Sequence, residues 1–406
     1  MTSHSLRHSP LPAVVCGGII LGVALGTRHV QGLFLPPMTM EHGWGREVFG
    51  FALALQNLAW GLTQPLTGMI ADRFGSARVL FLGVLAYAAG LYLQAVSDTP
   101  GALSVSAGLI IGFALSGTAF GAVYGALSRI LSPERRSWGL GLAGAIGGLG
   151  QFLMVPLAQG LIGTVGWMRA LMLLAALCVV LAPLTVALRD RPQGVAGAPS
   201  FADIGAAVRA ALSHRGFGLL NLGFLACGFQ LAFIASHLPA YLLDRGLGPR
   251  EGVTALALIA LANVVGTYYC GHLGGKYRRK HLLAGLYLVR ACAIAIFVAT
   301  PLAAPSVYVF AVVMGATWLG TVPLTNGLVA QIFGVRYIAT LFGFVFLGHQ
   351  LGSFAGVWLG GYFFDTTHSY QAVWLIAIAL GVVAAALHLL IDDTPQPASR
   401  LASAQA

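Results

Sequence analysis

Residues 68–78 read GMIADRFGSAR, a short charged segment between two long apolar stretches of the chain. Three charged residues, Asp72, Arg73 and Arg78, are concentrated in it, whereas charges are rare in the stretches 47–71 and 76–97 on either side. An apolar stretch of roughly 20 residues is long enough to cross a bilayer as a helix. The segment therefore predicts a tight turn at one membrane surface, between two spanning helices.

The composition of the whole chain agrees with a membrane protein. Of its 406 residues, 58% are hydrophobic and only 8% are charged, whereas a soluble domain has about 25% charged residues. The 54 glycines suit the close packing of membrane helices. We expect an all-α membrane protein with twelve transmembrane helices. Their expected spans are 11–36, 47–71, 76–97, 102–131, 137–163, 166–188, 217–243, 251–275, 281–303, 306–333, 338–364 and 370–391.

The basic residues predict how the chain lies in the membrane. The formal net charge is +10, and most of the 22 Lys and Arg fall in segments on one side of the expected spans. Because positively charged loops face the cytoplasm, we expect both termini there. The pattern indicates a lipid bilayer and not nucleic acid as the partner of the basic residues. We also expect a monomer, in a bacterial-type cytoplasmic (inner) membrane. The residues outside the pattern are Arg46, Arg169, Arg245 and Arg250 on the other side and Arg28 and Arg290 within the membrane.

One long polar connection, residues 189–216, divides the chain after the sixth span. It contains Pro, Gly and charged residues, and a short amphipathic stretch near 201–212 that we expect on the membrane surface. The expected organisation is a six-helix bundle over 1–188, the linker over 189–216, a second six-helix bundle over 217–391 and a cytoplasmic tail over 392–406.

The two halves are similar in sequence. A shift of 203 residues, without a gap, aligns 35–80 with 238–283 and gives twelve identical pairs. Many secondary transporters are built from two related halves, with the substrate held between them near the middle of the membrane. The glycine pairs at matching helix ends are Gly43 with Gly246, Gly45 with Gly248 and Gly68 with Gly271.

The segment 68–78 resembles the signature loop of the major facilitator superfamily, roughly G-x-x-x-D-R-x-G-x-x-R, which follows the second span in that family. A degenerate copy, GHLGGKYRRKH, begins at Gly271 in the second half. The resemblance implies two pseudo-symmetric six-helix bundles over the whole chain. The matching residues are Gly68, Asp72, Arg73, Gly75 and Arg78.

In that family the loop aspartate and nearby arginines form an intracellular gate, and the aspartate faces the start of helix eleven. Carried over, the aspartate would lie near Tyr337, where a carboxylate suits the positive end of the helix dipole. The alternative is that these charges only orient the loops. The gating residues that the resemblance implies are Asp72, Arg73, Arg78 and Arg129.

Within the superfamily the chain is similar to the monocarboxylate porters, which include lactate and pyruvate carriers and oxalate–formate exchangers. The similarity lies in TRHVQGLFLPPM at 27–38 and GWGREVFGFALALQNLAWGLTQPLTG at 43–68. Proton-linked carriers of that group have a basic residue in helix one, where this chain has Arg28. They usually also have an arginine in helix eight, where this chain has Thr267 and Asn263, and this departure weakens any transfer of the proton-coupling mechanism.

Arg28 and His29 lie inside the first apolar stretch, where a charge is costly unless something compensates it. All twelve acidic residues fall at expected helix ends or in loops. Because an arginine grips a carboxylate with two parallel hydrogen bonds, an anionic substrate is the natural partner of Arg28. The alternative is a bond to helix carbonyls or to a neighbour such as Gln56 or Asn57. The repeat itself needs no charge there, since the shift pairs Arg28 with Leu231.

Other polar residues within the expected spans are candidates for the same site. His349 and His29 are candidates for carrying a coupling proton near neutral pH. Arg290 is a second candidate cation, although helix nine is usually peripheral in this fold and a structural role is favoured. Tyr124 and Asn263 would orient the substrate or, alternatively, bond neighbouring helices. The expected substrate-binding set is Arg28, His29, Tyr124, Asn263, His349 and Arg290.

These features predict a secondary transporter that moves a small organic anion, a monocarboxylate in first place, by alternating access, with proton coupling left open. One alternative is efflux of a hydrophobic or weakly acidic toxic compound, and a less favoured one is a membrane receptor on a transporter scaffold. The sequence carries no complete nucleotide motif, nucleophile–base pair or metal-ligand spacing. Neither an enzyme nor a cofactor or metal site is therefore expected.

Overall fold

A computed structural model describes residues 10–44, 46–190 and 200–395, and nearly all of these residues are helical. The first half contains α1 (Leu11–His29), η1 (Gln31–Phe34), α2 (Leu35–His42), α3 (Arg46–Phe74), α4 (Ser76–Ala95), α5 (Pro100–Leu103), η2 (Ser104–Ile110), α6 (Ile111–Thr118), α7 (Phe120–Ile130), α8 (Pro133–Val165), α9 (Trp167–Leu181) and η3 (Ala182–Leu188). The second half contains α10 (Phe201–Leu212), α11 (Arg215–Asp244), α12 (Pro249–Leu273), α13 (Arg279–Ala299), α14 (Ala304–Thr317), α15 (Thr321–Phe333), α16 (Ile338–Thr367) and α17 (Gln371–Leu389).

The membrane-spanning helices agree with the all-α fold predicted from the sequence. In the described residues, 11 helical segments are long and apolar enough to cross a membrane. The one expected span that is not among these 11 segments, 47–71, corresponds to α3, a helix of 29 residues that packs along α16. This helix is the least apolar of the long helices because it carries side chains such as Gln56, Asn57 and Gln64.

Three spans are broken where the sequence predicts single helices. The expected span 102–131 is interrupted at Ala119, whose extended backbone separates α6 from α7. α1 ends at His29 and the chain continues as η1, and α14 ends at Thr317 before α15 begins at Thr321. A break inside a membrane leaves backbone groups unpaired unless side chains satisfy them. At the break between α14 and α15, Arg290 of α13 donates to the carbonyl oxygens of Thr317 and Trp318.

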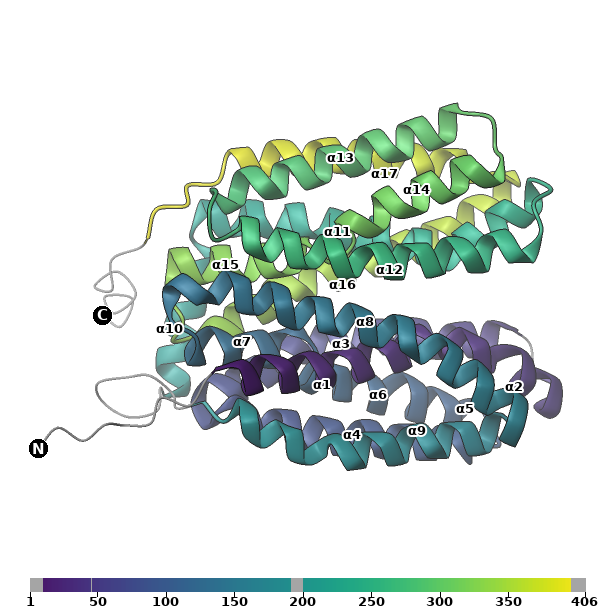
Figure 1. Ribbon diagram of the computed structural model, residues 1–406, viewed down its shortest axis with the longest axis horizontal. Coiled ribbons are helices and arrows are strands. Elements are labelled where there is room, and N and C mark those ends of the chain that lie inside the picture. The colour runs from purple at the N-terminus through teal and green to yellow at the C-terminus, as the bar shows by residue number, and fades with distance from the viewer. Residues whose placement is uncertain (1–9, 45, 191–199, 396–406) are drawn as a thin grey trace, which may run out of the picture.

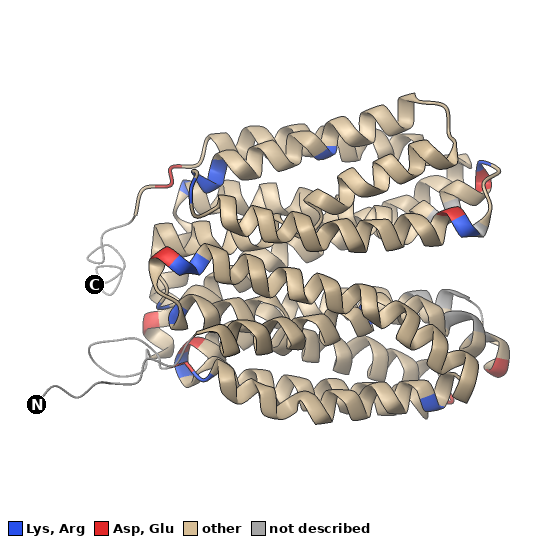
Figure 2. Ribbon diagram, in the orientation of Figure 1, with Lys and Arg blue, Asp and Glu red and all other residues tan. Residues whose placement is uncertain are grey.

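The helices form two groups that lie side by side (Figure 1). The helices α1 to α9 make up one group and α11 to α17 the other, and the seam between them is formed by α3 against α16 and by α8 against α12. The start of α1, the end of α17 and the linker helix α10 all lie at one end of the molecule. Most Lys and Arg of the described residues gather at this end (Figure 2), which we call the basic end.

The sequence repeat is visible in the backbone. Gly43 and Gly246, paired by the shift of 203 residues, both have a positive φ, at 66° and 85°. Gly68 and Gly271, also paired, lie at the two closest approaches of the seam. A Cβ at Gly68 would lie 2.4 Å from the Ala339 carbonyl oxygen, and one at Gly271 would lie 2.3 Å from the Cα of Gly141. The repeat therefore preserves the small residues that let the halves meet.

Replacing Gly68 or Gly271 by alanine should destabilise the joined halves by about 1–3 kcal/mol, because an added methyl group would overlap backbone atoms that cannot move independently. The measurement is thermal unfolding of the purified variants at a fixed ratio of detergent to lipid.

The matched control is Gly163→Ala on α8, because nothing lies within 4 Å of a Cβ added there. This change should be neutral or stabilising by up to about 1 kcal/mol, since alanine favours a helix more than glycine does. If Gly68→Ala and Gly163→Ala unfold at the same temperature, the close approach of the helices at the seam does not contribute to the stability of the protein.

Candidate functional site

Arg28 lies in the last turn of α1, and the N–H group of Val30 bonds back to the carbonyl oxygen of Gly26. A cation at the C-terminal end of a helix gains typically about 0.3–1 kcal/mol at an exposed site. A charge near the centre of a membrane helix costs about 2.5–3.5 kcal/mol on insertion scales. The helix end alone therefore does not account for Arg28. The adjacent His29 is exposed, and the described residues give it no hydrogen-bond partner.

Two side chains of α3 contact the Arg28 guanidinium. Its Nη2 donates to Oδ1 of Asn57, and its Cζ lies 5.2 Å from the centre of a Trp60 ring. Both neighbours are neutral. The Nε atom is buried and has no hydrogen-bond partner in the described part of the chain. The ion pairs found there involve Arg129, Arg278 and Lys280. The Arg28 guanidinium therefore remains un-neutralised and keeps an unused donor.

Aromatic contacts connect this cation to the second half of the molecule. The Trp60 ring lies 4.8 Å from Phe346 of α16, and Phe346 stacks on His349 with 5.1 Å between ring centres. The Nε2 of Gln350 lies 3.5 Å from the backbone oxygen of Asn57. The seam between α3 and α16 thus brings the cation of α1 and the imidazole of α16 into one region, near the middle of α16.

His349 has neutral neighbours as well. Its Nδ1 lies 3.1 Å from Oε1 of Gln350 and 3.4 Å from Oγ of Ser353, and its ring packs 4.9 Å from Phe224. The side chain is half-buried. Within the described residues no ion pair holds this imidazole.

Tyr124 and Asn263 lie at the other seam, between α8 and α12. The Tyr124 hydroxyl group reaches Gly144 of α8, where an added Cβ would lie 2.5 Å from it. Oδ1 of Asn263 accepts from the Thr267 hydroxyl group at 2.8 Å and from the N–H group of Leu319 at 3.0 Å. The Tyr124 Oη and the Asn263 Nδ2 are buried without a partner in the described residues. Their unused hydrogen-bonding atoms lie within the α8–α12 contact.

Arg290 is fully buried within the second half and uses all three of its nitrogens. Besides the carbonyl oxygens of Thr317 and Trp318, it donates from Nη1 to the Sγ of Cys227 at 3.1 Å, and its Nε lies 3.4 Å from the Thr317 hydroxyl group. Its Cζ lies 5.5 Å from the centre of the Tyr287 ring. These contacts cap the broken end of α14, which is the structural role favoured for this residue.

At the basic end, Asp72 joins the two halves. Its carboxylate accepts from the N–H groups of Ala339 at 3.2 Å and Thr340 at 2.7 Å, and from the Thr340 hydroxyl group at 2.6 Å. These residues form the first turn of α16, whose N–H groups have no partner within the helix. The positive end of the α16 dipole favours the carboxylate at this place.

Arg129 of α7 lies beside Asp72 and forms the centre of a buried network. Its Nη1 donates to Oδ1 of Asp72, its Nε to Oδ2 of Asp190, and its Nη2 to Oγ of Ser76, each at 2.6 Å. Asp190 also accepts from the N–H group of Ser76 at 2.8 Å. All four residues are buried. Breaking a buried ion pair by removing one partner typically costs about 3–5 kcal/mol, so this network ties the ends of α3, α4 and α7 together.

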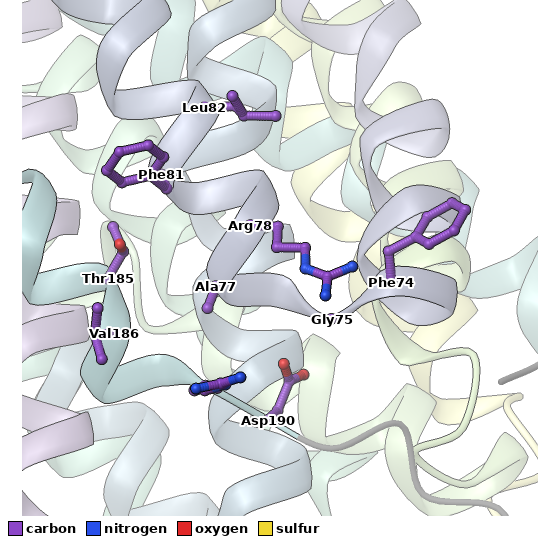
Figure 3. Close-up of a pocket in the computed structure, with 10 residues that line it drawn as sticks. Phe74, Gly75, Ala77, Arg78, Phe81, Leu82, Thr185, Val186 and Asp190 are labelled. Atoms are coloured by element: carbon purple, nitrogen blue, oxygen red, sulfur yellow. The ribbon is translucent and has the colours of Figure 1, made fainter. Parts of the chain in front are cut away.

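The other two arginines implied by the family resemblance lie outside this network. The Arg73 guanidinium lies over the rings of Phe74, at 5.3 Å, and Phe201 of the linker helix α10, at 4.5 Å. Arg78 is exposed on α4 and lines a groove together with Asp190 (Figure 3). The four expected gating residues thus divide into a buried pair, Asp72 and Arg129, and two arginines at separate places.

Trp60 and Asp190 are absent from the residues predicted for these sites. A signal for Trp60 is present in the sequence, because Asn57, Trp60 and Gln64 recur every three or four residues and so share one helix face. Asp190 carries no comparable signal, since it falls in the expected linker 189–216.

Comparison with known proteins identifies the fold and the family. The family model described as Major Facilitator Superfamily matches residues 17–357 and, in a second match, 254–406. Two solved structures of the fucose:proton symporter FucP, one from E. coli and one in an outward conformation, superpose with TM-scores of 0.72 and 0.73 at 15% identity. Each alignment covers 94% of this chain and 98% of the other.

Three curated relatives match over most of their lengths. Monocarboxylate transporter 11 of Homo sapiens is 26% identical over 378 residues, 89% of this chain and 78% of that protein. Monocarboxylate transporter 13 of Bos taurus is 28% identical over 318 residues, 77% and 73% of the two chains. The uncharacterized MFS-type transporter YcxA of Bacillus subtilis is 23% identical over 386 residues, 91% and 90%. On the match of the family model and the shared fold, this chain belongs to the major facilitator superfamily and is an integral membrane transporter, not an enzyme.

Proposed function

We propose that this transporter carries a small organic anion, a monocarboxylate in first place, and that Arg28 binds its carboxylate. The observation that carries the proposal is the Arg28 guanidinium itself, which has only neutral neighbours and a buried Nε without a partner among the described residues. A substrate carboxylate would neutralise the charge and take the unused donor. The two relatives named monocarboxylate transporters support the same class of substrate.

In this proposal the walls around the carboxylate come from both halves. Asn57 orients the guanidinium through its amide oxygen, and Trp60 and Phe346 provide apolar surface for the body of a small acid. Tyr124 and Asn263, at the α8–α12 seam, and the exposed His29 are second candidates for polar contacts. We leave Arg290 outside the site, because its own protein partners occupy all its nitrogens.

We infer that the basic end faces the cytoplasm, as the positive-inside rule predicts. Asp72 with Arg129 then forms the inner gate, and Arg28 lies closer to the outer surface. Asn57, beside Arg28, is separated from Asp72 by about 22 Å along α3, at about 1.5 Å per residue. Loss of the contact between Asp72 and α16 would let the halves part at the cytoplasmic side and release the anion there.

Transport should depend on the charge of Arg28. In proteoliposomes, Arg28→Gln should lower kcat/KM for uptake of a labelled short-chain monocarboxylate about 10- to 150-fold, the range expected for losing a hydrogen-bonded charge partner worth about 1.5–3 kcal/mol. Arg28→Lys should retain part of the activity, because the charge remains while the paired geometry is lost.

Arg250→Gln is the matched control, since Arg250 is exposed and the change removes the same charge at the surface of the other half. It should leave uptake unchanged. Normal carboxylate uptake by a folded Arg28→Gln variant would contradict the proposal. Transport of neutral or cationic compounds alone by the wild-type protein would favour the efflux function instead.

Asp72→Asn should open the inner gate, because the amide keeps the shape of the side chain but loses its charge toward Arg129 and the α16 dipole. The measurement is the distance between spin labels on Arg135→Cys and Tyr277→Cys, two exposed positions in opposite halves at the basic end, with the exposed Cys292 replaced by alanine. The variant should show a larger population of long distances than the parent. The control is Asp98→Asn, an exposed acid; an Asp72→Asn distribution identical to that of the control would argue against a gating role.

We propose His349 as the carrier of a coupling proton, with His29 as the second candidate, because His349 is half-buried beside the aromatic contacts that lead to Arg28. In His349→Gln, uptake driven by an inward proton gradient should be lost, while exchange of the anion at equal pH on both sides should continue. Gradient-driven uptake that survives in His349→Gln but not in His29→Gln would transfer the role to His29, and survival in both would exclude these histidines.

A further inference from the structure

A groove of about 970 Å³ lies at the basic end of the first half, between the end of α3, the start of α4 and η3 (Figure 3). The helices α4 and α9 form the face of this half that points away from the second half (Figure 1). Residues of α4 line the groove, so it opens toward the surrounding lipid and is separate from the site around Arg28. It also contains Arg78, one of the two signature-loop arginines that lie outside the buried network.

Both walls of the groove combine a basic residue with apolar side chains. On α4, Arg78, Phe81 and Leu82 are spaced three and four residues apart and so share one helix face. On the other wall, Val186 belongs to η3, and Arg189 directly follows the last residue of η3, with its N–H group bonded to the carbonyl oxygen of Val186 at 3.1 Å. The apolar side chains are well exposed, at 42% for Phe81, 64% for Leu82 and 66% for Val186.

The described residues that line the groove carry one positive charge in excess. Arg78 and Arg189 are exposed, and neither takes part in the ion pairs of the described residues. Asp190 also lines the groove, but its carboxylate is already bonded to Arg129, which shares its charge with Asp72. Of the described residues that line the groove, two are therefore cationic and one is anionic.

We propose that this groove binds one anionic phospholipid of the cytoplasmic leaflet. The phosphodiester would lie between Arg78 and Arg189, and an acyl chain would follow Phe81, Leu82 and Val186 into the membrane. Basic pockets between spanning helices at the cytoplasmic side suit anionic headgroups, and one singly charged phosphodiester balances the excess charge. A zwitterionic lipid has the same phosphate but also carries a cation. Because its net charge is zero, it leaves the excess positive charge of the groove unbalanced. This proposal does not depend on which substrate is transported.

The test is a titration of the purified, delipidated full-length protein with phosphatidylglycerol or with phosphatidylcholine of the same acyl chains, with bound lipids counted by native mass spectrometry. The wild type should bind the first phosphatidylglycerol more tightly than any phosphatidylcholine. Arg78→Gln with Arg189→Gln should raise the Kd for that lipid about 30-fold, or about fivefold per arginine. Arg78→Lys with Arg189→Lys should keep the preference for phosphatidylglycerol.

The matched control removes two other exposed arginines at the basic end, Arg135→Gln with Arg209→Gln, and should leave the Kd unchanged. A cooperative thermal unfolding transition shows that each variant is folded. If the glutamine variant is unfolded, the charge-conserving lysine variant is used to test the site. An unchanged Kd in a folded glutamine variant would overturn the proposal. So would displacement of phosphatidylglycerol by inorganic phosphate alone, because the groove would then be a site for a free anion and not for a lipid.

Discussion

The structure depends on a guanidinium group that is held inside the membrane without an acidic partner in the described residues. Neutral groups, namely the amide of Asn57, the ring of Trp60 and the C-terminal end of α1, stabilise the folded state around Arg28 but leave its charge in place. Arg290 shows the contrasting case: it is equally cationic, but its nitrogens are all used in capping a broken helix. The difference between the two arginines is the physical basis for assigning a ligand to one and a structural role to the other.

The same electrostatic reasoning explains how the halves are joined. Asp72 is bound both by Arg129 of its own half and by the N–H groups at the start of α16, which have no partner within that helix. The first interaction fixes the carboxylate within one half, and the second links it to the other half. Gly68 allows the close approach that the second contact needs, and its paired residue Gly271 allows a similar approach between α12 and α8. Charge and the lack of side-chain bulk therefore act together at the seam.

Much of this arrangement can be predicted from the sequence, because apolar length, loop charge and the repeat are local or periodic signals. The helical spans and the isolation of Arg28 from any nearby acid in the sequence follow directly. The break after His29 and the membership of Asp190 in the buried network do not, because they depend on tertiary contacts between distant segments. Arg78 shows the limit of motif reasoning, since its match to the loop pattern says nothing about whether it faces the network or the lipid.

The most direct test of the central claim compares an acid with its isosteric amide, because the two differ in charge and hardly in shape. The measurement is the melting temperature of the purified protein with lactate or with lactamide, for the wild type and for Arg28→Gln. The account predicts that only the acid stabilises the wild type, by up to about 2.7 kcal/mol at a concentration 100 times the Kd, and that this stabilisation disappears in the variant. Equal stabilisation by the amide, or an undiminished effect of the acid on Arg28→Gln, would contradict it.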